Sequence, residues 1–220
     1  MNYLCKQMND SIVNIIHLKI KNSKNGKLFF NNSFPEFDDE YVGQILSDLA
    51  NKKVIHRLSR GVYLKTKETR YGLVYPPVEK IAKAIAKRDK ANIVATGETA
   101  LYILGLTTQV PMNAVFLTSG SKRDIRIGER TITFKNATPK TFLIRGMQTS
   151  MIVQAMKAIG EKNMSDEYVP RISSLILQQA ERDTISNDLK AMPVWIRRIF
   201  VKTLKKGERY TFYPKNDLNV

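Results

Sequence analysis

The stretch NKKVIHRLSRGVYLKT, Asn51 to Thr66, decides how the first third of this 220-residue chain folds. Two short apolar runs flank the segment SRG, and Gly61 can adopt the positive φ that a tight turn requires. This pattern predicts a β-hairpin. The stretch is rich in cationic side chains and contains no acidic one. The hairpin therefore either contacts an anionic partner or is a solvated surface turn.

The segment before the hairpin predicts an amphipathic helix. In DDEYVGQILSDLANKK, residues 38–53, apolar residues recur at the spacing of one helical face, at Val42, Ile45, Leu46 and Leu49. Asp38 or Asp39 can serve as the N-cap. Further upstream we expect a helix beginning near Asp10 or Ser11, ended by NSKNG, and then a short strand at KLFF. The segment NSFPEF has room for a turn at most.

A helix, a strand, an amphipathic helix and a two-stranded hairpin follow the layout of a winged helix-turn-helix domain. In that interpretation the amphipathic helix enters the major groove and the hairpin is the wing that contacts phosphates. For Tyr63 the alternative is packing in the core. Acidic residues on the helix repel phosphates, so a role in protein interaction or dimerisation stays open. The residues predicted to contact DNA are Gln44, Ser47, Asn51, Lys52 and Lys53 from the helix, and Arg57, Ser59, Arg60, Tyr63 and Lys65 from the hairpin.

Charge is the strongest signal in the overall composition. The chain has 36 Lys and Arg against 20 Asp and Glu, a net charge of +16. The excess is spread along the whole chain and does not form a basic tail. A polyanion such as nucleic acid is the natural partner of such a protein. The alternative is a basic soluble protein without a nucleic-acid partner.

The remainder of the chain predicts a second, mixed module. Residues 66–77 form a linker with Gly72, Pro76 and Pro77, and a helix follows from residue 78. A strand at 93–95 leads into a helix capped by Thr96. Three strands are then expected at 113–120, 123–128 and 130–137, the last two joined by a turn at Gly128 and Glu129. Helices follow from residue 147, ended by Gly160, then from Ser165 as N-cap, and then within residues 192–214, with Pro193 near the start. The predicted domains are therefore 1–70 and 71–220, with strands up to about residue 145.

A second basic surface is also predicted. Three lysines share the face of the 78–90 helix opposite its apolar residues. Arginines alternate with isoleucines along the strands after it, and this period of two predicts one face in the core and one basic face. The alternatives are a further nucleic-acid contact and a solvated face. The candidate residues are Lys80, Lys83, Lys87, Arg123, Arg126 and Arg130.

The sequence contains no pattern that indicates catalysis. Glycine-rich phosphate loops, GxSxG and HxxxH are all absent, so we expect neither an enzyme nor a cofactor. One cysteine, Cys5, and two distant histidines, His17 and His56, do not predict a metal site. No apolar run reaches the roughly 20 residues that span a bilayer. We expect a protein of the cytoplasm with an α+β fold.

Several of these segments resemble the AbiEi-type antitoxins of type IV, abortive-infection toxin–antitoxin systems. The resemblance is carried by YPPVEKIAKAIAKRD, by TGETALYILGLTTQVPMNAVFLT and by the hairpin around IGERTITF, all within Tyr75–Lys140. LSRGVY resembles the wing of that family, at Arg57, Ser59, Arg60, Gly61 and Tyr63, and MPVWIRR resembles its C-terminal helix. The resemblance covers most of residues 25–205.

The resemblance implies a protein of two domains. An N-terminal winged helix-turn-helix domain would bind operator DNA and repress its own operon, and a C-terminal domain would carry the antitoxin activity. The implied partners are operator DNA and a nucleotidyltransferase-like toxin, with which the antitoxin need not form a stable complex. The alternative is a protein-interaction module that neutralises the toxin by direct contact.

Overall fold

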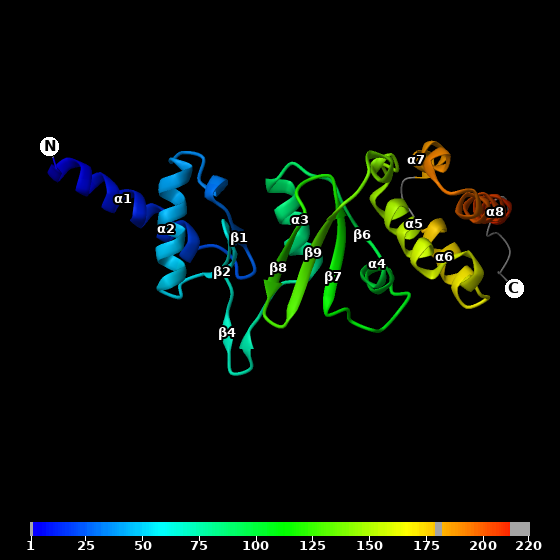
Figure 1. Ribbon diagram of the computed structural model, residues 1–220, viewed down its shortest axis with the longest axis horizontal. Coiled ribbons are helices and arrows are strands. Elements are labelled where there is room, and N and C mark those ends of the chain that lie inside the picture. Colours follow the sequence, from blue (N-terminus) through cyan, green and yellow to red (C-terminus); the bar gives the residue numbers. More distant parts are fainter. Residues whose placement is uncertain (1, 179–181, 212–220) are drawn as a thin grey trace, which may run out of the picture. The chain divides into compact units, whose positions relative to one another are not determined.

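The computed structural model describes residues 2–178 and 182–211, with side chains for 11–178 and 185–206. Helix and sheet alternate along the chain, so the fold is mixed α and β (Figure 1). Two compact units are distinguished by their internal contacts, residues 1–90 with 125–131, and residues 91–124 with 132–220. In the described part of the chain, no helix combines the length and the apolar composition needed to cross a membrane.

The first unit places two helices beside a small antiparallel sheet. Its elements are α1 (Asn2–Lys21), β1 (Leu28–Phe29), the 3₁₀ turn η1 (Asn31–Ser33), α2 (Asp39–Asn51), β2 (His56–Ser59) and β3 (Val62–Leu64). The strand order is β1-β3-β2. Phe29 pairs with Tyr63 across β1 and β3, and Arg57 pairs with Tyr63 across β2 and β3.

Helix α2 has the start and the buried stripe that its sequence predicts. The Asp38 carboxylate accepts hydrogen bonds from the amides of Glu40 and Tyr41, at 3.0 and 2.9 Å. Such an N-cap satisfies amides that have no partner inside the helix. The predicted apolar residues are all buried, in one core with Ile16, Ile20, Phe29 and Ile55. These residues are Val42, Ile45, Leu46 and Leu49.

Two predictions for the first unit are wrong. Helix α1 begins at Asn2, so neither Asp10 nor Ser11 is its N-cap. The polar residues at 9–11 therefore lie inside the helix and do not begin it. The expected linker contains a second hairpin, β4 (Glu68–Thr69) and β5 (Gly72–Leu73), around the exposed turn residues Arg70 and Tyr71.

Helix α3 (Val78–Arg88) clusters with the first unit, which therefore extends past the boundary expected at residue 70. The reason is visible at its last residue. The Arg88 guanidinium donates to the Gly61 carbonyl oxygen at 3.2 Å and lies 4.9 Å from the centre of the Phe30 ring. Pro77 precedes the helix as its N-cap, and the helix begins at residue 78 as predicted.

A four-stranded sheet has the order β6-β7-β9-β8, and β6, β7 and most of β9 belong to the second unit. The predicted turn at Gly128 is present, with φ +59°. Helix α5 contacts α4, β6 and α6, and α6 contacts α8. The strands are β6 (Ile93–Ala95), β7 (Asn113–Thr118), β8 (Arg123–Ile127) and β9 (Arg130–Asn136); the helices are α4 (Glu98–Ile103), η2 (Pro139–Phe142), α5 (Met147–Ile159), η3 (Glu161–Asn163), α6 (Tyr168–Leu177), α7 (Arg182–Asp188), η4 (Leu189–Ala191) and α8 (Val194–Thr211).

Two predicted helix caps in this unit are wrong. The N-cap of α4 is Gly97, and the Thr96 hydroxyl instead donates to Oε1 of Gln154 at 3.4 Å. Helix α6 begins at Tyr168 rather than directly after Ser165. The carbonyl of Ser165, not its side chain, accepts from the amides of Tyr168 and Val169. Helix α7 was not predicted, because its polar sequence carries no apolar period.

Candidate nucleic-acid interface

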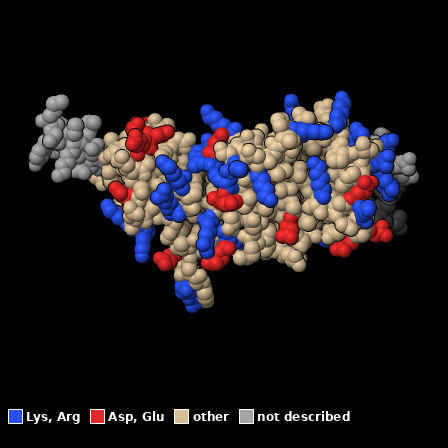
Figure 2. Space-filling view, viewed as in Figure 1, with Lys and Arg blue, Asp and Glu red and all other residues tan. Residues whose placement is uncertain are grey.

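The exposed face of α2 carries charges of both signs. Gln44, Asn51 and Lys52 are exposed on the face opposite the buried stripe. Glu40 and Asp48 share that face and are also exposed. Figure 2 shows acidic side chains gathered where α2 begins, where Asp39 and Glu40 form the first turn. Of the other predicted residues, Ser47 is half-buried, and Lys53 lies just after the helix with φ +59°.

The β2–β3 hairpin presents two free arginines. Arg57 and Arg60 are both exposed, and no hydrogen bond or ion pair joins the guanidinium of either one to another described residue. The pairing shifts between Arg57 and Ser59, which marks a β-bulge. A bulge bends its strand and changes where side chains point. Gly61 has φ +69°, a conformation that side-chain-bearing residues rarely adopt, so the turn requires glycine there.

The Arg88 side chain bonds to the backbone of this turn, a role that was not predicted from the sequence. Besides its bond to the Gly61 carbonyl, its Nε lies 2.7 Å from Oδ1 of Asp89. Burial lowers the pKa of Arg88, although an arginine stays charged at neutral pH. A cation that is partly buried between a ring and a carbonyl fixes the backbone it bonds to. Arg88 is therefore a positioning residue for the turn that carries Arg60.

Replacing Arg88 with methionine should weaken DNA binding indirectly. Methionine keeps an apolar stem against Phe30 but cannot donate to Gly61. We expect faster amide hydrogen exchange in the β2–β3 hairpin and roughly a three- to tenfold rise in Kd, about 0.6–1.4 kcal/mol. Lys24→Met is the matched control, since it removes one exposed charge from the same unit outside the predicted contact residues. Equal effects of both substitutions would contradict the positioning role.

Two predicted contact residues of the hairpin serve the fold instead. Tyr63 is only 3 % exposed and belongs to the hydrophobic core, which favours the packing alternative for this residue. The Lys65 ammonium donates to the carbonyl oxygens of Lys21 and Ser23, at 2.5 and 2.7 Å. Carbonyls at the end of a helix lack partners inside it, and a lysine there also interacts favourably with the helix dipole. Lys65 thus caps the end of α1.

Lys65→Met should destabilise the first unit without a specific effect on DNA binding. The substitution keeps the apolar stem and removes the charged donor from two carbonyls. We expect a loss of about 1 kcal/mol, at the low end for a charged hydrogen bond because the side chain is half-exposed. Urea unfolding followed by circular dichroism measures it. A larger drop in DNA affinity than for the exposed Lys67→Met would show instead that Lys65 contacts DNA.

The second predicted basic surface divides into parts. Lys80, Lys83 and Lys87 are exposed along α3, opposite its buried residues. The arginines of the strands do not share one face. Arg123 is separated from the buried Ile125 and Ile127 by even numbers of residues along its strand, and so is Arg130 from Ile132 and Phe134. Each arginine therefore occupies a strand position that belongs to the same face as those apolar residues. Among these three arginines, only Arg126 alternates with the buried positions of its strand as expected.

The environment of Arg123 confirms that its strand position faces the core side. Its guanidinium lies 5.5 Å from the centre of the Phe134 ring, and it is half-buried. Phe134 in turn lies against Phe116, with ring centres 6.1 Å apart. Arg123 therefore covers an aromatic pair and is a poor candidate for a nucleic-acid contact.

The β4–β5 turn adds an exposed aromatic that the sequence reasoning missed. Tyr71 is 84 % exposed, and the Arg70 guanidinium lies 4.6 Å from the centre of its ring. In Figure 1 this hairpin projects from the body of the first unit. An exposed ring beside a guanidinium is a combination that stacks on nucleic-acid bases. The sequence feature that could have indicated this turn is the adjacent pair Arg70 and Tyr71 between two short extended segments.

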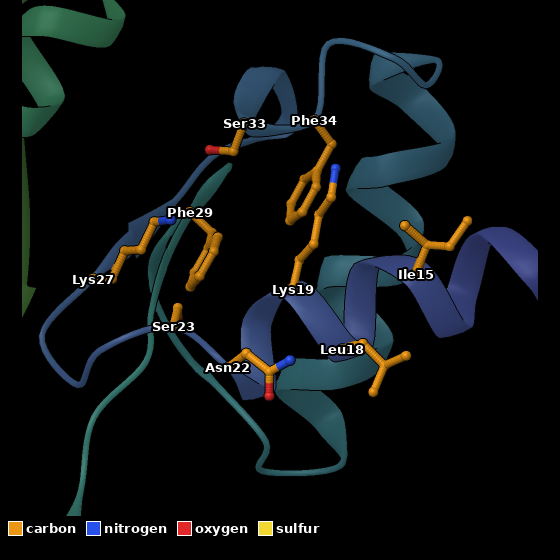
Figure 3. A pocket seen from close by; sticks show the side chains of 9 residues that line it. All are labelled: Ile15, Leu18, Lys19, Asn22, Ser23, Lys27, Phe29, Ser33 and Phe34. Carbon is orange, nitrogen blue, oxygen red and sulfur yellow. The ribbon is translucent and has the colours of Figure 1, made fainter.

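An apolar hollow of about 700 Å³ lies between α1, β1 and η1 (Figure 3). Phe29 and Phe34 are stacked with ring centres 6.0 Å apart, and the Lys27 ammonium lies 5.3 Å from the Phe29 ring. Lys19 forms an ion pair with Glu36. The hydrogen bond that Lys19 donates lowers the pKa of the Glu36 carboxyl from its ordinary value. This hollow offers apolar contact and two cations, and no pair of groups suited to acid–base catalysis.

Metal ligands do not gather in the part of the chain that the structure describes: no group of three His, Cys, Asp or Glu side chains occurs there. A model of the DUF6088 family, a family of unknown function, matches residues 15–185. The chain belongs to the DUF6088 family. No curated protein matches the sequence.

One solved structure similar to this DUF6088 chain is the crystal structure of the RV2827C protein from Mycobacterium tuberculosis. The two sequences are 11 % identical, and the match covers 89 % of this chain and 75 % of that one, with a TM-score of 0.44.

Proposed function

We propose that this DUF6088 protein is an antitoxin of a type IV toxin–antitoxin system that binds operator DNA and represses its own operon in the cytoplasm. The observation that carries the DNA-binding part is the pair Arg57 and Arg60, exposed and unpaired among the described residues on a bulged hairpin directly after α2. The antitoxin part rests on the resemblance of Tyr75–Lys140 to AbiEi-type antitoxins.

In this proposal the first unit acts as a winged helix-turn-helix domain. Helix α2 is the recognition helix, the β2–β3 hairpin is the wing, and η1 is what remains of the helix that normally precedes the recognition helix. Arg57 and Arg60 contact phosphates, which position the protein, while Gln44 and Asn51 are placed to contact base edges. The net charge of +16 attracts the protein to DNA over a longer range.

The acidic start of α2 favours a second candidate function. Asp39, Glu40 and Asp48 are exposed on the helix that would enter the groove, and carboxylates repel phosphates. A helix of this kind suits a basic protein surface better than DNA. The alternative is therefore a module that neutralises a nucleotidyltransferase-like toxin by direct contact. Retention of the untagged toxin on the tagged protein through a salt wash would favour it.

An electrophoretic shift of the DNA upstream of the protein's own gene tests the repressor role. The assay uses about 150 mM salt and an unrelated fragment of equal length, because phosphate contacts make affinity strongly dependent on salt. We expect a shift of the upstream fragment at concentrations at least about tenfold below those that shift the unrelated one. Equal, weak shifts of both fragments would mean that the charge gives only non-specific attraction.

A further inference from the structure

The second unit contains a basic hollow formed by three segments that are distant in the sequence. Lys140 comes from η2, Lys157 from the last turn of α5, and Lys190 from η4. All three are exposed and line one hollow of about 420 Å³. None of the described residues that line it is acidic. In Figure 2 basic side chains gather along the upper edge of this unit, and acidic ones lie mainly lower.

A buried polar side chain lies at the floor of this hollow. Gln154 is 5 % exposed, lines the hollow, and accepts the Thr96 hydroxyl with its Oε1. This bond leaves the amide nitrogen as a donor for a molecule in the hollow. Hydroxyls of Thr138 and Thr141 also line it, beside the apolar Ile144 and Met192.

The acidic residue next to this site in the sequence is already engaged. Both carboxylate oxygens of Asp188 accept backbone amides, from Arg145 at 2.9 Å and Gly146 at 3.0 Å. Asp188 is 2 % exposed, and its carboxylate is occupied by the backbone amides at the start of α5. The same bonds tie the segment that carries Lys190 to the helix that carries Gln154 and Lys157. The buried Asp188 therefore holds the shape of the hollow, and no ion pair joins its three lysines to an acidic side chain among the described residues.

We propose that this hollow, lined by Lys140, Lys157, Lys190 and Gln154, is a phosphate-binding site. Three ammonium groups provide the charge, and the amide and hydroxyl donors provide the hydrogen bonds that phosphate oxygens accept. The volume is within the range of small-ligand pockets. The phosphate belongs either to a free nucleotide or to the backbone of single-stranded RNA. This site is independent of the DNA-binding proposal, which concerns the first unit.

The test compares two triple variants of the full chain that lose the same charge. The site variant is Lys140→Ala, Lys157→Ala and Lys190→Ala. The control is Lys162→Ala, Lys202→Ala and Lys205→Ala, three exposed lysines of the same unit that do not line the hollow. The probes are ATP, measured by calorimetry, and a fluorescein-labelled 20-nucleotide RNA, measured by anisotropy at 50 and 200 mM salt. Thermal melting confirms that both variants fold.

We expect the site variant to bind at least about tenfold more weakly than wild type, and the control to stay within about threefold. Weaker binding of ATP as well as RNA would identify a free nucleotide as the source of the phosphate. Weaker binding of RNA alone, with a salt slope reduced by about 0.7 per lost contact, would identify the RNA backbone. Equal losses in the two variants, or no binding of either probe by wild type, would overturn the proposal.

Gln154→Leu provides a second, charge-neutral variant. It removes the amide donor while keeping a similar volume, so that general electrostatic attraction is unchanged. If the hollow binds phosphate, this substitution should weaken the binding of the same probe by about three- to tenfold. Unchanged binding by a folded Gln154→Leu protein would contradict the role of Gln154 and leave only a surface lysine effect, which would count against a built site.

Discussion

The double substitution Arg57→Ala and Arg60→Ala should raise the Kd for operator DNA by about 10- to 100-fold at 150 mM salt. Both side chains are exposed on the β2–β3 hairpin and are not occupied by contacts with other described residues. Each charged hydrogen bond to a phosphate contributes on the order of 1 kcal/mol or more, and 1.4 kcal/mol is a factor of ten. Fluorescence anisotropy with the upstream fragment measures the change.

The salt dependence separates two phosphate contacts from a general loss of charge. If each arginine meets one phosphate of duplex DNA, the slope of log K against log salt should fall by about 1.8. The matched control is Lys24→Ala with Lys67→Ala, two exposed lysines of the same unit outside the hairpin. Wild-type affinity in the arginine variant, or the same loss in the control, would show that the hairpin is not a wing on DNA.

Local elements of the first unit could be predicted from the sequence because their signals are local. The N-cap at Asp38 and the stripe from Val42 to Leu49 depend on residues within one helix. The turn at Gly61 depends on one glycine between two apolar runs. Patterns of this kind report propensity and period directly, without knowledge of the rest of the fold.

Residues that act through distant partners could not be predicted in the same way. Arg88 bonds the carbonyl of Gly61, 27 residues earlier, and Lys65 bonds that of Lys21, 44 residues earlier. From the sequence, Arg88 had no assigned role, and Lys65 was predicted to contact DNA. The three lysines of the phosphate hollow come together from positions 140, 157 and 190 only after the second unit folds. Composition predicted an anionic partner, but it could not show which lysines and arginines are engaged within the fold and which are left to bind that partner.

One error was avoidable from the sequence alone. In a strand, residues two apart share a face. Arg123 is two residues from Ile125, and Arg130 is two residues from Ile132, so each belongs to the face of its apolar neighbours. The structure follows this rule, with Arg123 over the Phe134 ring. Counting positions along each strand would have separated Arg126 from Arg123. Arg130 is the first residue of β9 and is exposed although it lies two positions from Ile132.

Tyr63→Ala should destabilise the first unit by roughly 3–5 kcal/mol, the range for removing a buried aromatic side chain. Tyr63 is 3 % exposed, pairs with both Phe29 and Arg57 across the three-stranded sheet, and packs in the core with Ile55. Removing its ring leaves a cavity between the sheet and α2. Because the two units can unfold separately, amide hydrogen exchange in α2 and β3 is the suitable measurement, with thermal melting as support.

Tyr63→Phe is the variant that distinguishes packing from DNA contact. It keeps the ring in the core and removes only the hydroxyl, which is the group that would meet a phosphate. We expect Tyr63→Phe to bind operator DNA within about twofold of wild type and to lose less than about 1 kcal/mol of stability, since a single neutral hydrogen bond contributes no more than that. If a folded Tyr63→Phe protein bound operator DNA with a tenfold higher Kd, the Tyr63 hydroxyl would contact the DNA. The wing surface would then include this residue at the edge of the core.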